Sequence, residues 1–234
     1  FHFDTMSIDL KMSIERLILL FLALDAIMIE LRQGQDTRMD IGIISDIHGD
    51  YRALDRALEF LGNYHKVDHI LCAGDLIGRG PEQDRVVETI RQRKIPTVRG
   101  NHDEWVHSLS PDNTVFLKQL PMDWYGNLGA YSVFMCHGKP GNNLWGLYRD
   151  HLSDTLLNMM LSSLKADILV TGHTHVPLHV KVDQGCVVNP GSIYTFNSVR
   201  KTSHTYGVLH MPEMIFNVYD VTKETPEAIP IGGV

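Results

Sequence analysis

Five short polar clusters along the chain combine the side chains that proteins use to bind divalent metal ions. Each cluster follows an apolar run, and in chain order they are Asp46-Ile47-His48, Gly74-Asp75, Gly100-Asn101-His102-Asp103, His137-Gly138 and Gly172-His173-Thr174-His175. The potential ligand atoms are carboxylate and amide oxygens and imidazole nitrogens, without a thiolate. This set suits Mn²⁺, Fe or Zn²⁺ better than Cu(I) or an iron–sulfur cluster. The clusters contain enough donors for two ions.

Two divalent ions bound side by side would favour the hydrolysis of a phosphoester. At a separation of roughly 3.5–4 Å, they can hold both the attacking and the leaving oxygen. They also lower the pKa of a bridging water, so that hydroxide is available as a nucleophile near neutral pH. In Asp46-x-His48 and His173-x-His175, residues two apart point to the same side of an extended backbone. Each pair can therefore bind one ion or straddle two.

The segments that precede the clusters are expected to be buried strands, because their apolar runs are continuous. The expected strands are 40–45, 69–73, 96–98, 131–136 and 167–171. Ligands from distant parts of a chain meet readily at the carboxyl ends of such strands, where open α/β sheets form their binding crevices. Helical spacing occurs at 51–61, 83–94 and 151–164. This alternation predicts parallel strands with crossover helices.

The second half of the chain has a different pattern. Short apolar runs are separated by tight turns, and they occupy 178–182, 186–189, 206–211 and 214–220. Such spacing is typical of β-hairpins. An α/β half followed by a hairpin-rich half predicts an α/β (α+β) fold with two mixed β-sheets that face each other and helices outside.

The composition is that of an ordinary globular protein. The 234 residues are 44% hydrophobic and 21% charged, which fits one large domain or two small ones. A net charge of −7 argues against a protein that binds long nucleic acid or anionic membranes through a basic surface. Cys72, Cys136 and Cys186 each lie in an apolar run without a C-x-x-C pair. We expect buried, reduced thiols in a cytoplasmic protein, with a redox or thiolate–metal role as the alternative.

Residues 1–38 are expected to be an extension of a catalytic domain that occupies 39–222, and 223–234 are expected to be a C-terminal tail. Residues 13–33 have the pattern of one helix, but acidic residues interrupt an apolar run shorter than the roughly 18–20 residues that span a bilayer. No signal-peptide pattern is evident. An extension without a catalytic role is favoured over an oligomerisation helix, which would give a homodimer, and over a membrane anchor. We expect no membrane partner.

The order D-x-H, G-D, G-N-H-D, H-G and G-H-x-H resembles the motif series of the calcineurin-like metallophosphoesterase superfamily. The resemblance covers Met39 to about Asp220, and the residues around His137 and Asn189-Pro190-Gly191-Ser192 are most similar to the small bacterial and archaeal phosphodiesterases. It implies a four-layer αββα sandwich and hydrolysis of phosphodiester bonds in a small substrate. It also implies two divalent metal ions, with Mn²⁺ expected and Zn²⁺, Fe or Ni²⁺ as alternatives.

The same resemblance implies a role for each cluster residue. Seven would be metal ligands, with three for one ion, three for the other and one bridging carboxylate: Asp46, His48 and His175; Asn101, His137 and His173; and Asp75. His102 would lie near the leaving-group oxygen, where it would protonate that oxygen or stabilise charge on the phosphoryl group. Asp103 would orient His102. Asn101 would also hold a phosphoryl oxygen of the substrate.

One stretch invites a second comparison. Residues 74–80, with the sequence G-D-L-I-G-R-G, resemble the G-D-x-x-D-R-G motif of serine/threonine phosphoprotein phosphatases and dinucleoside tetraphosphatases, except that Gly78 replaces an Asp. Arg79 would then bind a substrate phosphate bidentately, or it faces solvent. A phosphomonoesterase, a phosphoprotein phosphatase or a dinucleoside polyphosphate hydrolase is therefore an alternative. The alternative from another class is a non-catalytic, metal-binding scaffold for protein partners.

Two segments, 104–123 and 138–148, are expected to be irregular and to determine substrate specificity. Trp105 and Trp145 lie in them, and they could stack a base or nucleoside, or pack their loops against the domain. Long nucleic acid is not expected as a substrate, whereas a short oligonucleotide or a cyclic nucleotide stays open. Arg200-Lys201 could face substrate phosphate or solvent.

Overall fold

The structure is a computed structural model of the chain, and it describes residues 38–105, 109–196 and 203–231. The chain divides into two units, Phe1–Thr37 and Arg38–Val234, and the second contains all the described residues. The helix expected at 13–33 lies outside them, as does Arg200-Lys201. Among the described residues, no helix combines the length and the apolar character needed to cross a membrane.

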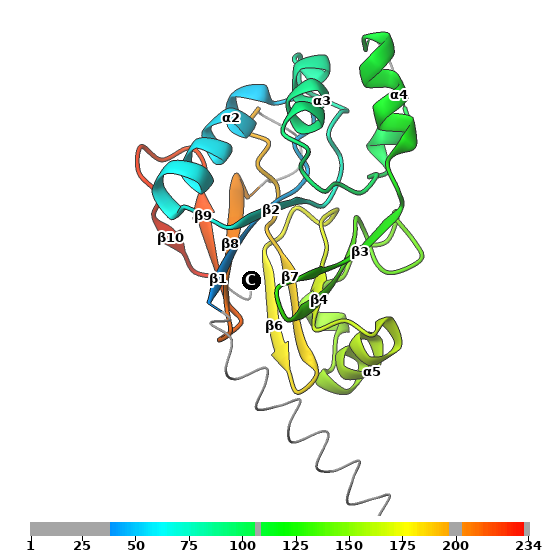
Figure 1. Ribbon diagram of the computed structural model, residues 1–234, viewed down its shortest axis with the longest axis vertical. Helices are drawn as coiled ribbons and strands as arrows, with labels where there is room; N and C mark the ends of the chain where they lie inside the picture. Colours follow the sequence, from blue (N-terminus) through cyan, green and yellow to red (C-terminus); the bar gives the residue numbers. More distant parts are fainter. Residues whose placement is uncertain (1–37, 106–108, 197–202, 232–234) are drawn as a thin grey trace, which may run out of the picture. The chain divides into compact units, whose positions relative to one another are not determined.

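Two mixed five-stranded β-sheets form the centre of the second unit (Figure 1). The first sheet has the order β10-β9-β8-β1-β2, and its strands are β1 (Met39–Ile44), β2 (His69–Cys72), β8 (Thr205–Met211), β9 (Ile215–Asp220) and β10 (Ala228–Ile229). The second has the order β3-β4-β5-β7-β6, and its strands are β3 (Asp123–Leu128), β4 (Tyr131–Cys136), β5 (Ile168–Val170), β6 (Leu178–Val182) and β7 (Gly185–Asn189). Strand β1 pairs with β2 in parallel, as does β5 with β4 and with β7. The predicted hairpins β6–β7 and β8–β9 are antiparallel.

The side chains of the central strands alternate between two core layers, because successive residues of a strand point to opposite faces. In β1, Ile41 and Ile43 belong to the cluster between the sheets, while Ile44 belongs to the cluster under α2 and α3. In β4, Met135 lies in the cluster between the sheets and Cys136 in the cluster under α5. Burial on both faces explains why these strands have continuous apolar sequences.

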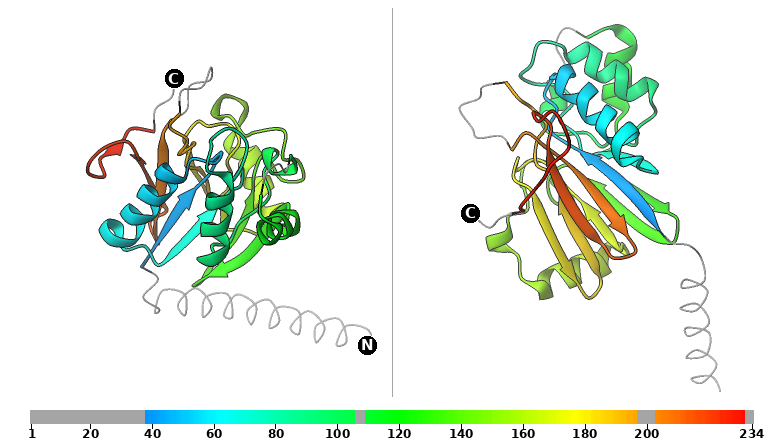
Figure 2. Two further views of the ribbon diagram at one scale, coloured as in Figure 1. Left: turned by 90° about the horizontal axis from the view of Figure 1, so that it is seen from above. Right: turned by 90° about the vertical axis from the view of Figure 1, so that its left-hand side faces the viewer.

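Helices cover the outer face of each sheet (Figure 2). On the side of the first sheet lie α2 (Tyr51–Glu59), the π-helical turn η1 (Phe60–His65), α3 (Gln83–Gln92) and α4 (Pro111–Gln119), which packs against α3. The second sheet is covered by α5 (Asp154–Leu164). Two short 3₁₀ helices, η2 (His102–Glu104) and η3 (Arg149–His151), complete the fold. The predicted four-layer α/β fold, with helices outside two mixed sheets, is confirmed.

The expectation of an irregular segment at 104–123 is wrong, because this segment contains α4 and the first residue of β3. Helix α4 lacks an apolar stripe, and its buried residues are Asn113 and Leu117. The Asn113 amide donates a hydrogen bond of 2.8 Å to the Asp84 carboxylate of α3. Burial of Leu117 in the cluster under α2 and α3, together with this polar contact, holds α4 in place, and hydrophobic periodicity could not indicate the polar contact.

Most expected boundaries agree to within two residues, and three further segments differ by more than that or in kind. The strand expected at 96–98 is a single bridge between Thr97 and Cys72. The helix expected at 151–164 begins at Asp154, because the Ser153 hydroxyl caps its first turn. Part of the expected C-terminal tail forms β10, which pairs with β9. The bridge at Thr97 still precedes the Asn101 cluster, and the strands expected before the other four clusters are present as β1, β2, β4 and β5.

The three cysteines are buried and free, as expected: Cys72, Cys136 and Cys186. Burial raises the pKa of each thiol, to about 12 for Cys72 and for Cys186. A thiolate is therefore disfavoured at all three positions.

Candidate metal centre

The five polar clusters lie together, four of them after β1, β2, β4 and β5 and the fifth after the bridge at Thr97. Backbone hydrogen bonds join the turns that carry these clusters. The Asp46 N–H donates to Gly74 O at 3.0 Å. Gly172 N–H donates to His137 O at 2.7 Å. The arrangement predicted from the strand ends is therefore present, and it brings side chains from both sheets to one place.

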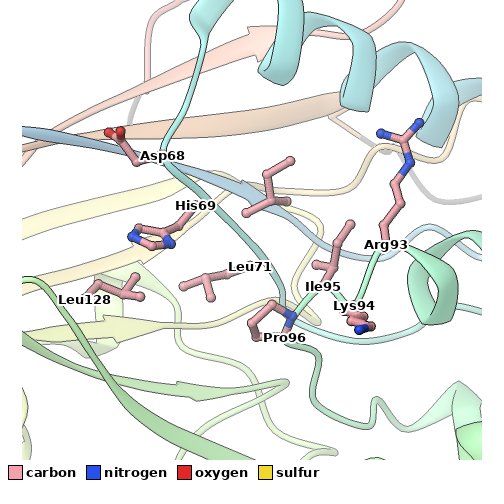
Figure 3. Close-up of a pocket in the computed structure, with 9 residues that line it drawn as sticks. Asp68, His69, Leu71, Arg93, Lys94, Ile95, Pro96 and Leu128 are labelled. Carbon is pink, nitrogen blue, oxygen red and sulfur yellow. The ribbon is translucent and has the colours of Figure 1, made fainter.

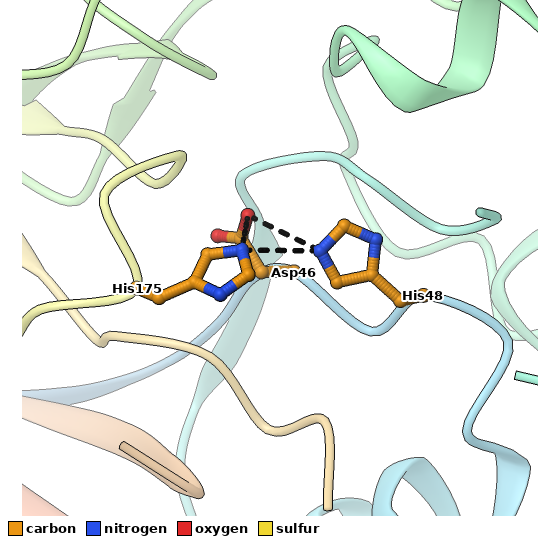
Figure 4. A group of neighbouring side chains, drawn as sticks. All are labelled: Asp46, His48 and His175. Carbon is orange, nitrogen blue, oxygen red and sulfur yellow. Dashed lines mark hydrogen bonds and ion pairs between the residues drawn. The ribbon is translucent and has the colours of Figure 1, made fainter. Parts of the chain in front are cut away.

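One group contains Asp46, His48 and His175 (Figure 4). The Nε2 atoms of the two histidines are 3.1 Å apart, and Asp46 Oδ1 lies 3.1 Å from Nε2 of His175 and 3.8 Å from Nε2 of His48. Ligands of one metal ion at bonds of about 2.0–2.2 Å are separated by roughly 3–3.6 Å. Asp46 Oδ1 is buried and has no hydrogen-bond partner among the described residues. A divalent cation fits between these three atoms.

A second group adjoins the first. The Nε2 atom of His137 lies 3.3 Å from Asp75 Oδ2 and 3.1 Å from Asn101 Oδ1. The same Asn101 oxygen lies 2.9 Å from Nδ1 of His173. Asp75 Oδ2 is also 3.8 Å from Nε2 of His48, so this carboxylate lies between the two groups. The seven predicted ligands are thus brought together in two adjoining sets.

Backbone carbonyls orient the imidazole rings of two histidines through the Nδ1 atoms, which face away from the centre. Nδ1 of His137 donates to Ala73 O at 2.7 Å, and Nδ1 of His48 lies 3.3 Å from Ile77 O. Because a carbonyl can only accept, Nδ1 carries a proton in both rings, and a neutral ring held in this way directs the lone pair of Nε2 into the centre. This is the tautomer that a metal ion requires.

Each carboxylate has one oxygen that accepts hydrogen bonds and one that faces the centre. Asp46 Oδ2 accepts from Ser45 Oγ at 2.6 Å and from His173 N–H at 3.0 Å. Asp75 Oδ1 accepts from His102 N–H at 2.8 Å. Donors that hold a ligand from behind fix its orientation before the ion binds. The two inward oxygens are those within ion-pair distance of the histidines.

The electrostatics of the centre call for a cation. Burial would raise the pKa of Asp46 and Asp75, but the surrounding histidines outweigh it and hold both pKa values below the usual range. Burial lowers the pKa of His48 to about 4, so its ring is neutral. Burial would also lower the pKa of His137, but Asp75 outweighs it and raises the pKa to about 10. A positive charge is thus strongly favoured at this place, and a metal ion would supply it.

Backbone strain is concentrated in the same turns. Five of the seven predicted ligands have φ between 51° and 68°: Asp46, His48, Asp75, His173 and His175. The left-handed region costs a residue with a Cβ of order 1–3 kcal/mol, and such strain is frequent at functional sites. A side chain at Gly100 would overlap Asp75, which explains the glycine between β2 and the Asn101 turn.

His102 lies beside the two groups. Its ring packs edge-on against that of His48, with centroids 4.8 Å apart, and a ring nitrogen lies close to both His48 and Asp75. The ring is partly exposed, whereas four of the predicted ligands are buried: Asp46, His48, Asp75 and His137. This position suits a group that reaches a substrate on the open side of the centre.

Asp103 makes different contacts from the expected one. Its two oxygens accept four backbone N–H groups at 2.8–3.1 Å: those of Asp75, Leu76, Ile77 and Gly100. Burial and the neighbouring Asp75 raise the pKa of Asp103 to about 7. The four backbone N–H groups oppose this rise, because they donate best to the ionised carboxylate. None of these bonds goes to the His102 ring. The geometry supports a role in joining the Asp75 turn to the Asn101 turn.

Gly78 is a site residue whose contacts the sequence did not reveal. It has a φ of 142°, and a Cβ there would lie 2.9 Å from His102 Nδ1 and 3.1 Å from His48 Nδ1. The signal that could have indicated this position is the glycine itself, which stands where a related motif has Asp. Arg79 follows it and is exposed, with its backbone N–H donating to His48 O at 3.3 Å.

Two cavities differ in their relation to the centre. The cavity in Figure 3, of 430 Å³, lies beside the edge strand β2, and its lining includes Asp68, Arg93 and Leu128 but no predicted ligand. A cavity of 480 Å³ begins at the centre and is lined by Asn101, Glu104, Trp105, Asn143 and Leu144. Because Asn101 lines it, a substrate bound at the centre can enter this second cavity.

Comparison with known proteins gives one family. Residues 39–214 match the calcineurin-like phosphoesterase superfamily domain. A protein from Methanocaldococcus jannaschii is 27% identical over 177 residues, which are 66% of this chain and 70% of that protein. A symmetrical bis(5'-nucleosyl)-tetraphosphatase from Buchnera aphidicola is 40% identical over 67 residues, only 28% of this chain and 24% of that enzyme. A metallophosphoesterase from Sphaerobacter thermophilus has a similar fold, with a TM-score of 0.58, 23% identity, and 82% of this chain and 88% of that chain covered.

Proposed function

The chain belongs to the calcineurin-like phosphoesterase superfamily, and we propose that it hydrolyses phosphodiester bonds in small substrates with the help of two divalent metal ions. The observation that carries this proposal is the buried Oδ1 of Asp46, which has no hydrogen-bond partner in the part of the chain that the structure describes, while the Nε2 atoms of His48 and His175 face it. An oxygen of this kind costs free energy unless a cation or a donor binds it.

The two sets of ligands define where the ions would be held. Asp46, His48 and His175 would hold one ion, and Asn101, His137 and His173 the other, with Asp75 between them. Two ions there would supply charge stabilisation for the phosphoryl oxygens and a hydroxide nucleophile near neutral pH. Mn²⁺ is the proposed metal, with Zn²⁺, Fe or Ni²⁺ as alternatives, and all four are compatible with oxygen and imidazole ligands without a thiolate.

The chain's own groups would act on the leaving group. His102 lies beside the centre on a short 3₁₀ turn, so its ring is placed to donate a proton to the departing oxygen. Asn101 presents its amide at the mouth of the 480 Å³ cavity, where its NH₂ group can donate to a phosphoryl oxygen. Asp103 would act indirectly, because it holds the turns that carry these residues.

Hydrolysis of a phosphomonoester or a dinucleoside polyphosphate is the second candidate activity. The short match to a bis(5'-nucleosyl)-tetraphosphatase supports it, as does the exposed guanidinium of Arg79 beside the His48 turn. An arginine in this place binds a terminal phosphate dianion better than a diester, which carries one charge. Loss of Arg79 would then raise KM for monoesters alone.

A non-catalytic scaffold is the alternative from another class. The positions of His102 and of all the predicted ligands are filled by residues able to act, and strained backbone holds several of them in place. The strained ligand turns would serve a metal-binding scaffold as well as a catalyst, whereas His102, which is not among the predicted ligands, would be needed only for catalysis. The proposed location is the cytoplasm, because the buried thiols are reduced.

The experiment that tests the proposal compares two aryl esters. Metal-stripped protein is assayed on bis(p-nitrophenyl) phosphate and on p-nitrophenyl phosphate, each with Mn²⁺, Zn²⁺, Mg²⁺ or Ni²⁺ added. We expect metal-dependent hydrolysis with the diester preferred. A preference for the monoester would move the protein to the second candidate activity. No turnover of either ester with any metal would favour the scaffold.

A further inference from the structure

We propose that the substrate is a nucleotide ester, and that its base stacks on Trp105 in the 480 Å³ cavity beside Asn101. This inference rests on the proposed function, because it names the class of phosphoester that the centre would cleave. Four structural features of the described residues support it, and they concern the position, walls, polar groups and size of the cavity.

The cavity begins where a phosphate would bind. Asn101 lines it and also presents its Oδ1 atom to His137 and His173 at 3.1 Å and 2.9 Å. Asn143 and Leu144, which also line the cavity, belong to a loop that is close to the centre. A Cβ on Gly146 would lie 3.2 Å from Cδ2 of His173. A group attached to a phosphate at the centre can therefore extend directly into the cavity.

The walls of the cavity are exposed apolar side chains. Trp105 is 70% exposed and Leu144 is 65% exposed, so neither packs its loop against the domain. The backbone N–H of Trp105 donates to His102 O at 3.1 Å, which joins the backbone of Trp105 to the turn that carries His102. Exposed apolar groups that line one hollow are typical of ligand sites. The flat face of an indole suits a planar ring.

Polar groups lie among these apolar walls. The Glu104 carboxylate, paired with Arg99 at 3.4 Å, can accept from a base N–H or a ribose hydroxyl. Asn143 offers an amide whose Nδ2 lies 3.9 Å from the Met122 sulfur, a weak acceptor that leaves its donors for a ligand. An acyl chain would leave these groups without partners. A nucleobase has flat apolar faces and a polar edge, and it matches both.

The size of the cavity agrees with this ligand class. Its volume of 480 Å³ lies within the roughly 300–1,000 Å³ of small-molecule sites. The cavity at the edge of β2 is of similar volume, but it has no predicted metal ligand in its lining and would not hold a phosphate at the centre. Trp145 is also exposed, at 66%, yet it does not line the 480 Å³ cavity, so it provides a matched control.

The test measures the contribution of the base to binding. Mn²⁺-loaded protein is titrated calorimetrically with AMP and with ribose 5-phosphate, which carry the same phosphate on the same sugar oxygen. Stacking of one base is worth enough to make AMP bind about 5- to 150-fold more tightly. Trp105→Ala should bring the two dissociation constants close together, whereas Trp105→Phe should retain most of the difference. Trp145→Ala should leave the ratio unchanged.

Several results would overturn the inference. Equal affinities for AMP and ribose 5-phosphate in the unmodified protein would show that the site does not bind the base. Failure of both ligands to bind would also contradict the inference. A ratio that survives Trp105→Ala would place the base elsewhere. Binding of 1-butyl phosphate as tight as that of AMP would indicate a pocket for an alkyl chain. Hydrolysis of bis(p-nitrophenyl) phosphate by the same preparation tests the proposed function separately, since that substrate needs no base.

Discussion

Replacement of Gly78 by alanine should reduce turnover without removing any functional group. The new Cβ would lie 2.9 Å from His102 Nδ1, so the ring must move to at least the 3.4 Å of an ordinary contact, a displacement of about 0.5 Å. A misplacement of 1 Å at a reacting group costs on the order of 10²-fold in rate. We therefore expect kcat to fall about tenfold. Alanine at the positive φ of 142° should also lower the free energy of unfolding by about 1–3 kcal/mol, because a residue with a Cβ is strained there.

The assay is the steady-state hydrolysis of bis(p-nitrophenyl) phosphate at saturating Mn²⁺, so that kcat is compared at full metal occupancy. Gly129→Ala is the matched control, because Gly129 also has a positive φ, of 57°, but no atom lies within 4 Å of the added Cβ. It should lose stability and retain kcat. Urea unfolding of both variants measures the shared effect of the backbone.

The reasoning would be refuted if Gly78→Ala kept kcat within a factor of two while both variants were destabilised. His102 would then have no required position beside the centre. An equal fall of kcat in Gly129→Ala would also contradict it, because general loss of stability would explain both results.

Three further predictions concern single residues. His102→Ala should lower kcat by about 10²- to 10⁴-fold, whereas elemental analysis should find its Mn²⁺ content unchanged; loss of the metal instead would make His102 a ligand. Asp103→Ala should lower the free energy of unfolding in urea by about 3 kcal/mol or more, because four backbone N–H groups lose their acceptor; a variant as stable as the parent but inactive would restore the orienting role. The Asn113 amide and the Ser110 N–H lower the pKa of Asp84. The pKa of Asp84 in the folded state is thus below the unfolded value of about 3.9. The contribution of ionised Asp84 to the free energy of unfolding is therefore present above that pH and is lost as the pH falls further. The difference in stability between the parent and Asp84→Ala should therefore be present at pH 7 and shrink below about pH 4, and a difference that is constant with pH would contradict this.

The sequence predicted the strands and the joint position of the polar clusters because both depend on local patterns. Strands buried on two faces must be apolar along their length, and their carboxyl ends meet at one edge of a sheet. Asp46 after β1 and His137 after β4 could therefore be expected to lie together. The bridging position of Asp75 and the grouping of the other ligands came from the family resemblance, since two-residue spacing left both arrangements open.

The features that the sequence did not predict depend on contacts between distant segments. The hydrogen bond between Asn113 of α4 and Asp84 of α3 is one such contact. Both residues are polar, so the apolar periodicity of the sequence does not indicate it. Asp103 accepts hydrogen bonds from backbone N–H groups up to 28 residues away, and no property of its own position shows this. The contact between Gly78 and His102 is a matter of available space, which a sequence does not record.

The most direct measurement is an anomalous-difference map from crystals of the protein grown with Mn²⁺. The expected result is two peaks a few ångströms apart, with one bound by Asp46, His48 and His175, the other bound by Asn101, His137 and His173, and Asp75 touching both. A map without a peak among these side chains would contradict the proposed centre. A single peak that persists at saturating Mn²⁺ would contradict the mechanism with two ions.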